Sequence, residues 1–123
     1  MRGYVYIVSN RGSFGEGVYK IGMTHRANPM DRVEELNCAS VPFPFDVECI
    51  IPTEDADGLE RWFHEALSRY RVNKVNGLKE FFKVDSGVLE RLVHDLDASV
   101  EFGVYKASDE WMASKLLGGN IDG

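Results

Sequence analysis

Two short runs of alternating residues near the N-terminus constrain the fold of this chain more than any other feature. Residues 3–8 (GYVYIV) and 18–22 (VYKIG) alternate β-branched residues with aromatic or polar ones, as half-buried strands do. Residues 9–17 between them are rich in Gly, Ser and Asn, which reverse a chain. The pattern predicts an antiparallel pair. Because side chains alternate between the faces of a strand, an ionisable cluster that includes Tyr6 and Lys20 can share one face.

A helix is predicted directly after the second strand. Asn28 followed by Pro29 is typical of an N-cap with proline at the first helical position, and Asp31 suits the positive end of the helix dipole. Arg32 therefore lies on a helix beside the strand pair, where its alternative role is an ion pair with Glu35 three residues on. Apolar residues recur at helical spacing in this segment (Met30, Val33 and Leu36).

A third strand and a second helix follow a connector that is rich in proline. Residues 45–51 alternate well enough for a strand, which we expect to end at Pro52. Residues 55–70 carry the clearest helical pattern, and Glu60 lies at the border of its apolar stripe, so a carboxylate is held against the edge of the core. The predicted stripe consists of Ala56, Leu59, Phe63, Ala66, Leu67 and Tyr70.

The last third of the chain predicts smaller elements. Residues 79–84 fit a short strand or extended segment, and Ser86 can cap a helix whose apolar residues pack on the core. Residues 108–117 fit a short final helix that ends at two glycines. The apolar positions of the helix after Ser86 are Val88, Leu89, Leu92, Val93 and Leu96.

Together these elements predict an α/β fold, a small antiparallel sheet of three main strands flanked by helices. A chain of 123 residues with 44% hydrophobic content is long enough for a single core without metal or disulfide staples. We expect one domain, with a core over residues 1–84 and a C-terminal helical extension over residues 85–123 packed on it. Cys38 and Cys49 are expected to be free, buried thiols rather than a disulfide.

Charge and hydropathy bound the location and the partners. No apolar run approaches the roughly 18 residues that a membrane helix needs, so we expect a soluble, cytoplasmic protein without a membrane partner. The net charge of −6 argues against simple coating of nucleic acid, which depends on Lys and Arg. The acidity is concentrated at the end of the chain, because residues 1–83 carry 11 Lys and Arg against 12 Asp and Glu, whereas residues 84–123 carry 3 against 8. A positively charged groove formed by residues 1–83 is therefore compatible with the negative net charge of the whole chain.

Five short motifs occur in an order that resembles the GIY-YIG nuclease superfamily, in particular its phage-encoded and restriction-associated branch with lysine in the second motif. The resemblance covers residues 3–84, and five motifs in sequence are more specific than any one alone. Two motifs depart from the usual pattern. Tyr4-Val5-Tyr6 occupies the place of Gly-Ile-Tyr, and Lys20-Ile21-Gly22 occupies the place of Tyr-Ile-Gly, with Tyr19 one residue earlier. The motifs are Tyr4-Val5-Tyr6, Lys20-Ile21-Gly22, Leu59-Glu60-Arg61-Trp62-Phe63-His64, Arg71-Val72-Asn73 and Glu80-Phe81-Phe82.

The resemblance implies a catalytic site for phosphodiester hydrolysis. Glu60 would be the ligand of a hard divalent ion, Mg²⁺ or Mn²⁺, and Arg32 would hold the scissile phosphate through its fork of donors. Tyr6 would be the general base or would orient the water, and Lys20 would lower the pKa of that phenol and contact phosphate. His64 would act on the substrate side or as an acid, although Glu60 and His64 also have the spacing of two transition-metal ligands. The structural alternatives are a solvated glutamate on a helix and ordinary strand packing.

The expected partner is DNA. A homodimer, a fused domain or a partner protein would add sequence specificity, because a chain of this size leaves little surface for reading bases. The alternative function is a catalytically inactive module that binds nucleic acid or protein on the same scaffold, including an accessory domain of a restriction or phage-defence system. The residues expected to contact nucleic acid are His25, Arg26, Arg71, Asn73 and Lys74.

Overall fold

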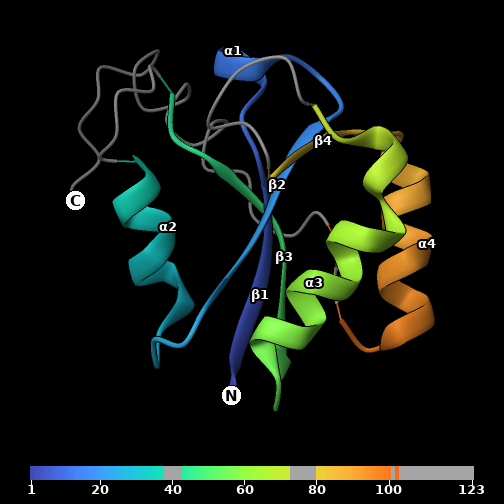
Figure 1. The fold of residues 1–123 in the computed structure, drawn as a ribbon. Coiled ribbons are helices and arrows are strands. Elements are labelled where there is room, and N and C mark those ends of the chain that lie inside the picture. The colour runs from blue at the N-terminus through green and yellow to red at the C-terminus, as the bar shows by residue number, and fades with distance from the viewer. Residues whose placement is uncertain (38–42, 73–79, 101, 103–123) are drawn as a thin grey trace.

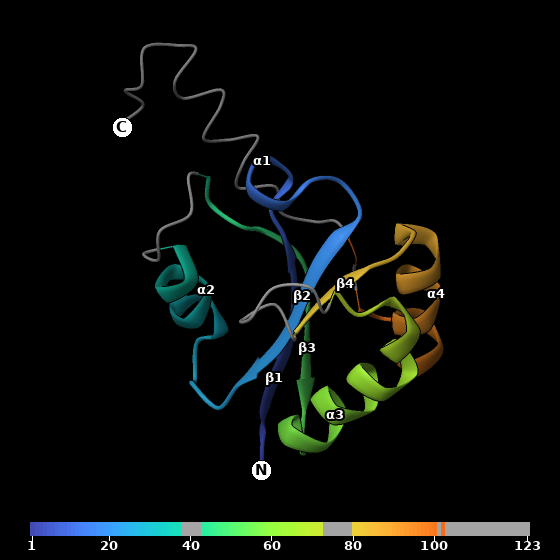
Figure 2. The same ribbon diagram turned by 45° about the horizontal axis from the view of Figure 1, so that its top comes forward.

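The fold places one sheet between two layers of helices. The computed structural model of the chain describes residues 1–37, 43–72, 80–100 and 102. Four antiparallel strands form the sheet in the order β3-β1-β2-β4, with α2 on one face and α3 and α4 on the other (Figure 1). The same arrangement is visible after rotation (Figure 2). The predicted α/β class with a small antiparallel sheet is therefore confirmed, and a short fourth strand joins the three main ones.

The strands have the bounds β1 Gly3–Ser9, β2 Val18–Thr24, β3 Asp46–Thr53 and β4 Phe81–Lys83. The predicted pairing of the first two strands is confirmed, and β1 lies between β2 and β3. β3 continues through Pro52, its next-to-last residue, to Thr53, so the predicted stop at this proline was wrong. Proline is tolerated there because β3 is an edge strand.

The helices have the bounds α1 Arg11–Phe14, α2 Pro29–Asn37, α3 Ala56–Ala66 and α4 Ser86–Leu96, and a 3₁₀ turn, η1, covers Ser68–Tyr70. The predicted helices after Asn28 and Asp55 are confirmed, and both residues cap as expected. The Asn28 side chain accepts from the Met30 amide at 3.0 Å, and Asp55 accepts from the Gly58 amide at 3.0 Å.

The segment expected to be a plain turn contains the one-turn helix α1. The Asn10 side chain accepts a hydrogen bond from the Ser13 amide at 3.1 Å, and Gly15 ends the turn at φ 91°. Asn10 also donates to the Phe43 carbonyl at 2.6 Å, which ties α1 to the approach to β3. Gly and Ser reverse the chain here through a capped helical turn rather than a tight hairpin.

Two apolar clusters lie on the two faces of the sheet. Among the described residues, thirteen buried residues lie in the cluster on the α3 and α4 face, and six lie in the cluster on the α2 face. The first cluster consists of Val5, Ile7, Tyr19, Ile21, Cys49, Ile51, Phe63, Leu67, Phe82, Val84, Leu89, Val93 and Val100. The second consists of Tyr6, Val8, Val33, Phe45, Val47 and Phe81.

Some details of the predicted helix faces differ from the structure. Ala66, the last residue of α3, is exposed, whereas Leu67 and Tyr70 from the same predicted stripe pack on the core. The N-cap of α4 is Asp85 rather than Ser86, since the Asp85 side chain accepts from the Gly87 amide at 2.7 Å. Val88 and Leu96 are each 41% exposed, and α4 packs through Leu89 and Val93 instead.

Other predictions concern cysteines, membranes and the end of the chain. Cys49 is a free, buried thiol as predicted, and burial raises its pKa to about 12. Among the residues that the structure describes, no helix is long and apolar enough to cross a membrane. Cys38, Asn73, Lys74 and the helix predicted over residues 108–117 lie outside the described residues.

Candidate active site

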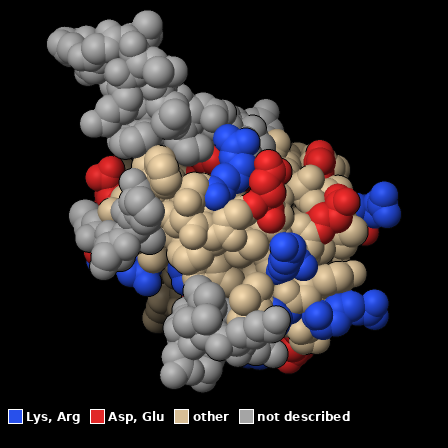
Figure 3. All heavy atoms as spheres, turned by 90° about the horizontal axis from the view of Figure 1, so that it is seen from above, with Lys and Arg blue, Asp and Glu red and all other residues tan. Residues whose placement is uncertain are grey.

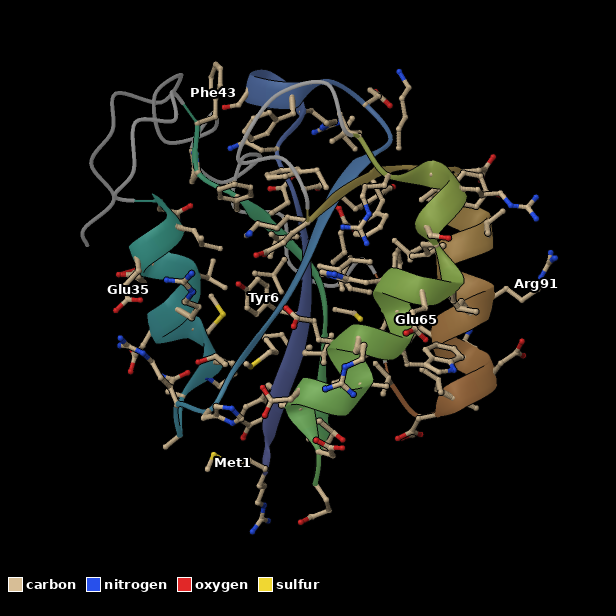
Figure 4. The ribbon with its side chains drawn as sticks, viewed as in Figure 1. Met1, Tyr6, Glu35, Phe43, Glu65 and Arg91 are labelled. Atoms are coloured by element: carbon tan, nitrogen blue, oxygen red, sulfur yellow. The ribbon has the colours of Figure 1, made fainter. Side chains whose placement is uncertain are left out.

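Tyr6 reaches across the sheet because the residue opposite it has no side chain. Tyr6 pairs with Gly22 in the register of β1 and β2. A Cβ atom at Gly22 would lie 2.3 Å from the Tyr6 hydroxyl oxygen and 2.6 Å from Cζ, closer than real contacts allow. The phenol therefore lies over the backbone of β2, which gives a physical reason for glycine in the Lys20-Ile21-Gly22 motif. Figure 4 shows Tyr6 between the strands and α2.

Arg32 joins α2 to this phenol. The guanidinium of Arg32 donates a hydrogen bond to the hydroxyl oxygen of Tyr6, and this bond raises the pKa of Arg32. Arg32 Nη1 also donates to Glu35 Oε1 at 3.2 Å, so the alternative role as an i,i+3 partner occurs together with the contact to Tyr6. Tyr6 is 1% exposed, whereas the Arg32 side chain is 41% exposed. Arg32 is therefore the member of this pair that a ligand in solution can contact.

Beyond the end of β4, no described strand pairs with the outer edge of β2, and groups from the α3 side of the sheet contact it there. β4 pairs with β2 only over Val18–Lys20 within the described chain. The next residue, Ile21, donates its amide to the Glu80 carbonyl at 3.1 Å, and its carbonyl oxygen lies 2.8 Å from His64 Nε2. Because a carbonyl only accepts, His64 donates from Nε2, and this bond holds α3 against the strand edge. Glu60 lies one turn earlier on α3 and so reaches the same edge.

Lys20 is held by a carboxylate at this edge. Lys20 Nζ donates to Glu80 Oε1 at 2.5 Å, and the Lys20 side chain is only 11% exposed. The ammonium group also lies over the Phe81 ring, 5.5 Å from its centroid. Lys20 is therefore a partly desolvated cation on the same face as Tyr6, as the alternation predicts.

Five ionisable side chains thus meet where β2 leaves β4, and we call them the edge cluster: Tyr6, Lys20, Arg32, Glu60 and Glu80. Burial raises the pKa of Glu60 above its ordinary value of 4.5, and the nearby negative charge of Glu80 adds to this, while His64 and Lys20 oppose it. No hydrogen bond or ion pair to Glu60 occurs among the described residues. Glu60 is the carboxylate of the cluster that stays available to a ligand.

The predicted effect of Lys20 on Tyr6 was wrong. Burial raises the pKa of Tyr6 above its ordinary value of 10.0, the Arg32 hydrogen bond opposes this, and the charges of Glu80 and Glu60 raise the pKa further. Lys20 does not produce a phenolate because its charge is paired with Glu80. In the free protein Tyr6 is therefore a neutral phenol that positions Arg32.

The residues predicted to contact nucleic acid are spread over the surface. His25 lies at the end of β2, with Nδ1 3.0 Å from the Arg2 carbonyl oxygen and Nε2 3.3 Å from Asp57 Oδ2. Arg26 forms an ion pair with Glu35, and the guanidinium of Arg71 lies 5.2 Å from the Phe82 ring centroid. On the face in Figure 3, Lys and Arg are interspersed with Asp and Glu among the described residues. That face does not carry a patch of one sign.

The edge cluster has the donor set of a hard-cation site with few protein ligands. Within the described part of the chain, no group of three or more His, Cys, Asp and Glu side chains is arranged to hold a metal ion. Mg²⁺ often takes one or two carboxylates and completes its shell with water and phosphate oxygens. Glu60, with its raised pKa and a second carboxylate nearby, fits that pattern. His64 donates from Nε2 to the Ile21 carbonyl, which leaves Nδ1 as the ring nitrogen with a free lone pair.

Two features of the site were not assigned from the sequence. The sequence marks Glu80 only as part of a motif, and its pairing with Lys20, 60 residues earlier, depends on β4 joining β2. Glu35 accepts from both Arg26 and Arg32, which sequence spacing suggests for Arg32 alone. The unusual lysine at position 20 was the available signal for a nearby carboxylate.

Fold and edge cluster together define a small α/β domain with ionisable groups gathered at a sheet edge. Residues 3–102 match the T5orf172 domain, and the chain belongs to this family. The family is a phage-associated one related to nuclease-like folds. No curated protein and no solved structure matches the chain. The matched range includes α4, in agreement with its two buried side chains in the larger core cluster.

Proposed function

We propose that this protein is a divalent-metal-dependent endonuclease of the GIY-YIG type that hydrolyses phosphodiester bonds in DNA. The observation that carries the proposal is the edge cluster, in which a buried phenol, two cations and two carboxylates converge from five separate parts of the chain. Phosphodiester hydrolysis needs that combination, because negative charge on the phosphoryl oxygens must be offset while water attacks. Membership of the T5orf172 family supports the assignment.

Each member of the cluster has a distinct task in this proposal. Arg32 donates to the oxygens of the scissile phosphate, and Tyr6 holds its guanidinium in place from below. Glu60 would hold Mg²⁺ or Mn²⁺, which would supply the positive charge that the phosphoryl oxygens need. Lys20 exchanges Glu80 for a phosphate oxygen, and the freed Glu80 carboxylate lies beside the bound substrate. His64 keeps α3 and therefore Glu60 in register with β2.

A second candidate is a module that binds nucleic acid or protein without cutting it. The observation in its favour is that Lys20, Arg26 and Arg32 all pair with carboxylates in the free protein. On that reading the pairs are structural, and DNA does not displace them. A homodimer, a fused domain or a partner protein would supply sequence specificity under either proposal.

The experiment is nicking of supercoiled plasmid and cutting of labelled oligonucleotides with Mg²⁺, Mn²⁺ or EDTA. The variants are Glu60→Gln and Arg32→Ala. The matched controls are Glu65→Gln and Arg91→Ala, since both residues are exposed and lie away from Tyr6 (Figure 4). We expect metal-dependent cutting by the parent and both controls, and its loss in both cluster variants. Binding without cutting by a folded parent would favour the second candidate.

A further inference from the structure

A pocket at the end of the sheet lies next to the edge cluster and has no role in the function proposed above. It has a volume of about 680 Å³ and is formed where β1 begins and where β2 and β3 end. That volume lies within the range of about 300–1,000 Å³ that is typical of small-molecule sites. Its lining includes Arg2, Tyr4, His25, Arg26, Ala27 and Pro52. Glu54 also lines the pocket, so three basic side chains and one carboxylate surround an aromatic ring and two small apolar side chains.

Tyr4 connects this pocket to the edge cluster along one strand. Tyr4 and Tyr6 are two positions apart on β1, so they lie on the same face of the sheet, about 7 Å apart. Tyr4 pairs with Thr24 in β2 and with Pro52 in β3, and it is only half-buried. A ring at this position is available to a ligand that already contacts the edge cluster.

Arg26 connects the same two places by a second route. It lines the pocket and forms an ion pair with Glu35, which also accepts from Arg32 at 3.2 Å. Arg32 in turn donates to Tyr6. The two arginines are therefore joined through one carboxylate, and an extended chain of phosphates can replace that carboxylate at both.

The existing ion pairs of the pocket are weak enough for such an exchange. Arg2 lies 3.8 Å from Glu54, and the two side chains are 82% and 87% exposed. His25 and Arg26 pair with carboxylates that are also well exposed. Exposed pairs of this kind contribute little to stability, so a phosphate can compete with them.

We propose that this pocket binds an unpaired nucleotide of the DNA strand that occupies the edge cluster, one position along from the scissile phosphate. Tyr4 stacks on the base, and Arg26 contacts the phosphate. The base must be unpaired because stacking on Tyr4 needs one of its faces to be free of the neighbouring base pairs. The inference rests on the proposed nuclease function for the place of the scissile phosphate, and it implies a single-stranded or frayed substrate.

The first test measures the affinity of a short fluorescein-labelled oligothymidylate by anisotropy in EDTA, where no cutting occurs. Tyr4→Ala is expected to weaken binding by about 5- to 150-fold, the usual cost of losing one stacked base. Tyr4→Phe keeps the ring and is expected to bind as the parent does. Equal binding by Tyr4→Ala and the parent would overturn the proposal, as would an equal loss in Tyr4→Phe.

Arg26→Ala keeps the test decisive if Tyr4→Ala folds poorly, because Arg26 is an exposed residue between elements. Its binding should lose about one unit of salt slope, as expected for one phosphate contact. Arg91→Ala, on α4 across the sheet, is the matched control and should leave the slope unchanged. An unchanged slope in Arg26→Ala would contradict the phosphate contact.

A last experiment separates this inference from the proposed function. An abasic site placed next to the cut position should weaken binding to the parent, because it removes the base that stacks on Tyr4. It should not weaken binding to Tyr4→Ala, which already lacks the ring. Tyr4-dependent binding without any metal-dependent cutting would refute the nuclease and leave the pocket as a nucleotide site. Cutting that does not depend on Tyr4, with equal binding to duplex, would refute the pocket alone.

Discussion

The two faces of the sheet differ in what they bury. In the described part of the chain, the face under α3 and α4 carries thirteen buried cluster residues, which are apolar apart from the Tyr19 hydroxyl and the Cys49 thiol. The face under α2 carries six, and one of them is Tyr6, whose hydroxyl is bound by a cation. The face under α3 and α4 therefore contributes more apolar burial to stability, whereas the face under α2 has fewer buried apolar residues and holds charged groups beside Tyr6. The edge cluster lies at the edge of β2 beyond the end of β4, where Arg32 from the α2 face and Glu60 from the α3 face both reach.

The largest expected effect compares two neighbours on β4 that point to opposite faces. Phe82 belongs to the larger cluster and Phe81 to the smaller one. Phe82→Ala should lower the free energy of unfolding by about 3–5 kcal/mol, the usual cost of emptying a closed core. Phe81→Ala should cost less stability, since fewer apolar neighbours surround it, but should weaken activity through Lys20. Urea unfolding of both variants measures this, and equal losses would remove the distinction between the faces.

Arg32→Lys tests whether the α2 face is specialised for chemistry. A lysine keeps the charge but cannot bind Tyr6, Glu35 and phosphate through one planar fork. We expect cutting to fall about 10²–10³-fold, the typical loss when one stabilising donor is removed from a transition state. The midpoint of urea unfolding should stay close to that of the parent. A variant that is destabilised in proportion to its lost activity would instead make Arg32 a structural residue.

Gly22→Ala tests how the phenol crosses the sheet. The new methyl group would collide with the Tyr6 hydroxyl, so the ring must move or the strands must separate. We expect a loss of about 1–3 kcal/mol in stability, as for other overpacked sites, together with reduced cutting. Gly87→Ala on α4 is the control, because its methyl group would meet only the Asp85 side chain at 3.2 Å. Full stability and activity in Gly22→Ala would show that Tyr6 can work from another position.

The smallest expected effect concerns the pH dependence of stability at Glu60. Burial raises the pKa of this carboxyl in the folded protein, so its ionisation opposes folding as the pH rises above the ordinary value of 4.5. Glu60→Gln removes that penalty and should be slightly more stable than the parent at neutral pH, with the difference disappearing in acid. Thermal unfolding at pH 4 and pH 7.5 measures it. A variant that is less stable than the parent at neutral pH would mean that Glu60 stabilises the fold.

Much of the fold followed from local patterns. The paired strands, the capped helix after Asn28 and the helix after Asp55 were all predicted because alternation, helical spacing and capping residues are short-range signals. Where sequence reasoning differed from the structure, tertiary contacts were responsible. Asn10, which also bonds to Phe43, builds a capped turn instead of an open loop, and Ala66 is exposed at the end of α3.

The candidate site divides in the same way. The sequence by itself determined which residue types were present and that Tyr6 and Lys20 share a face, because side-chain direction along a strand is local. Only the tertiary structure decided their electrostatic partners. Glu80 takes the charge of Lys20, and burial keeps the Tyr6 phenol neutral, since pKa values depend on distances between groups far apart in the chain.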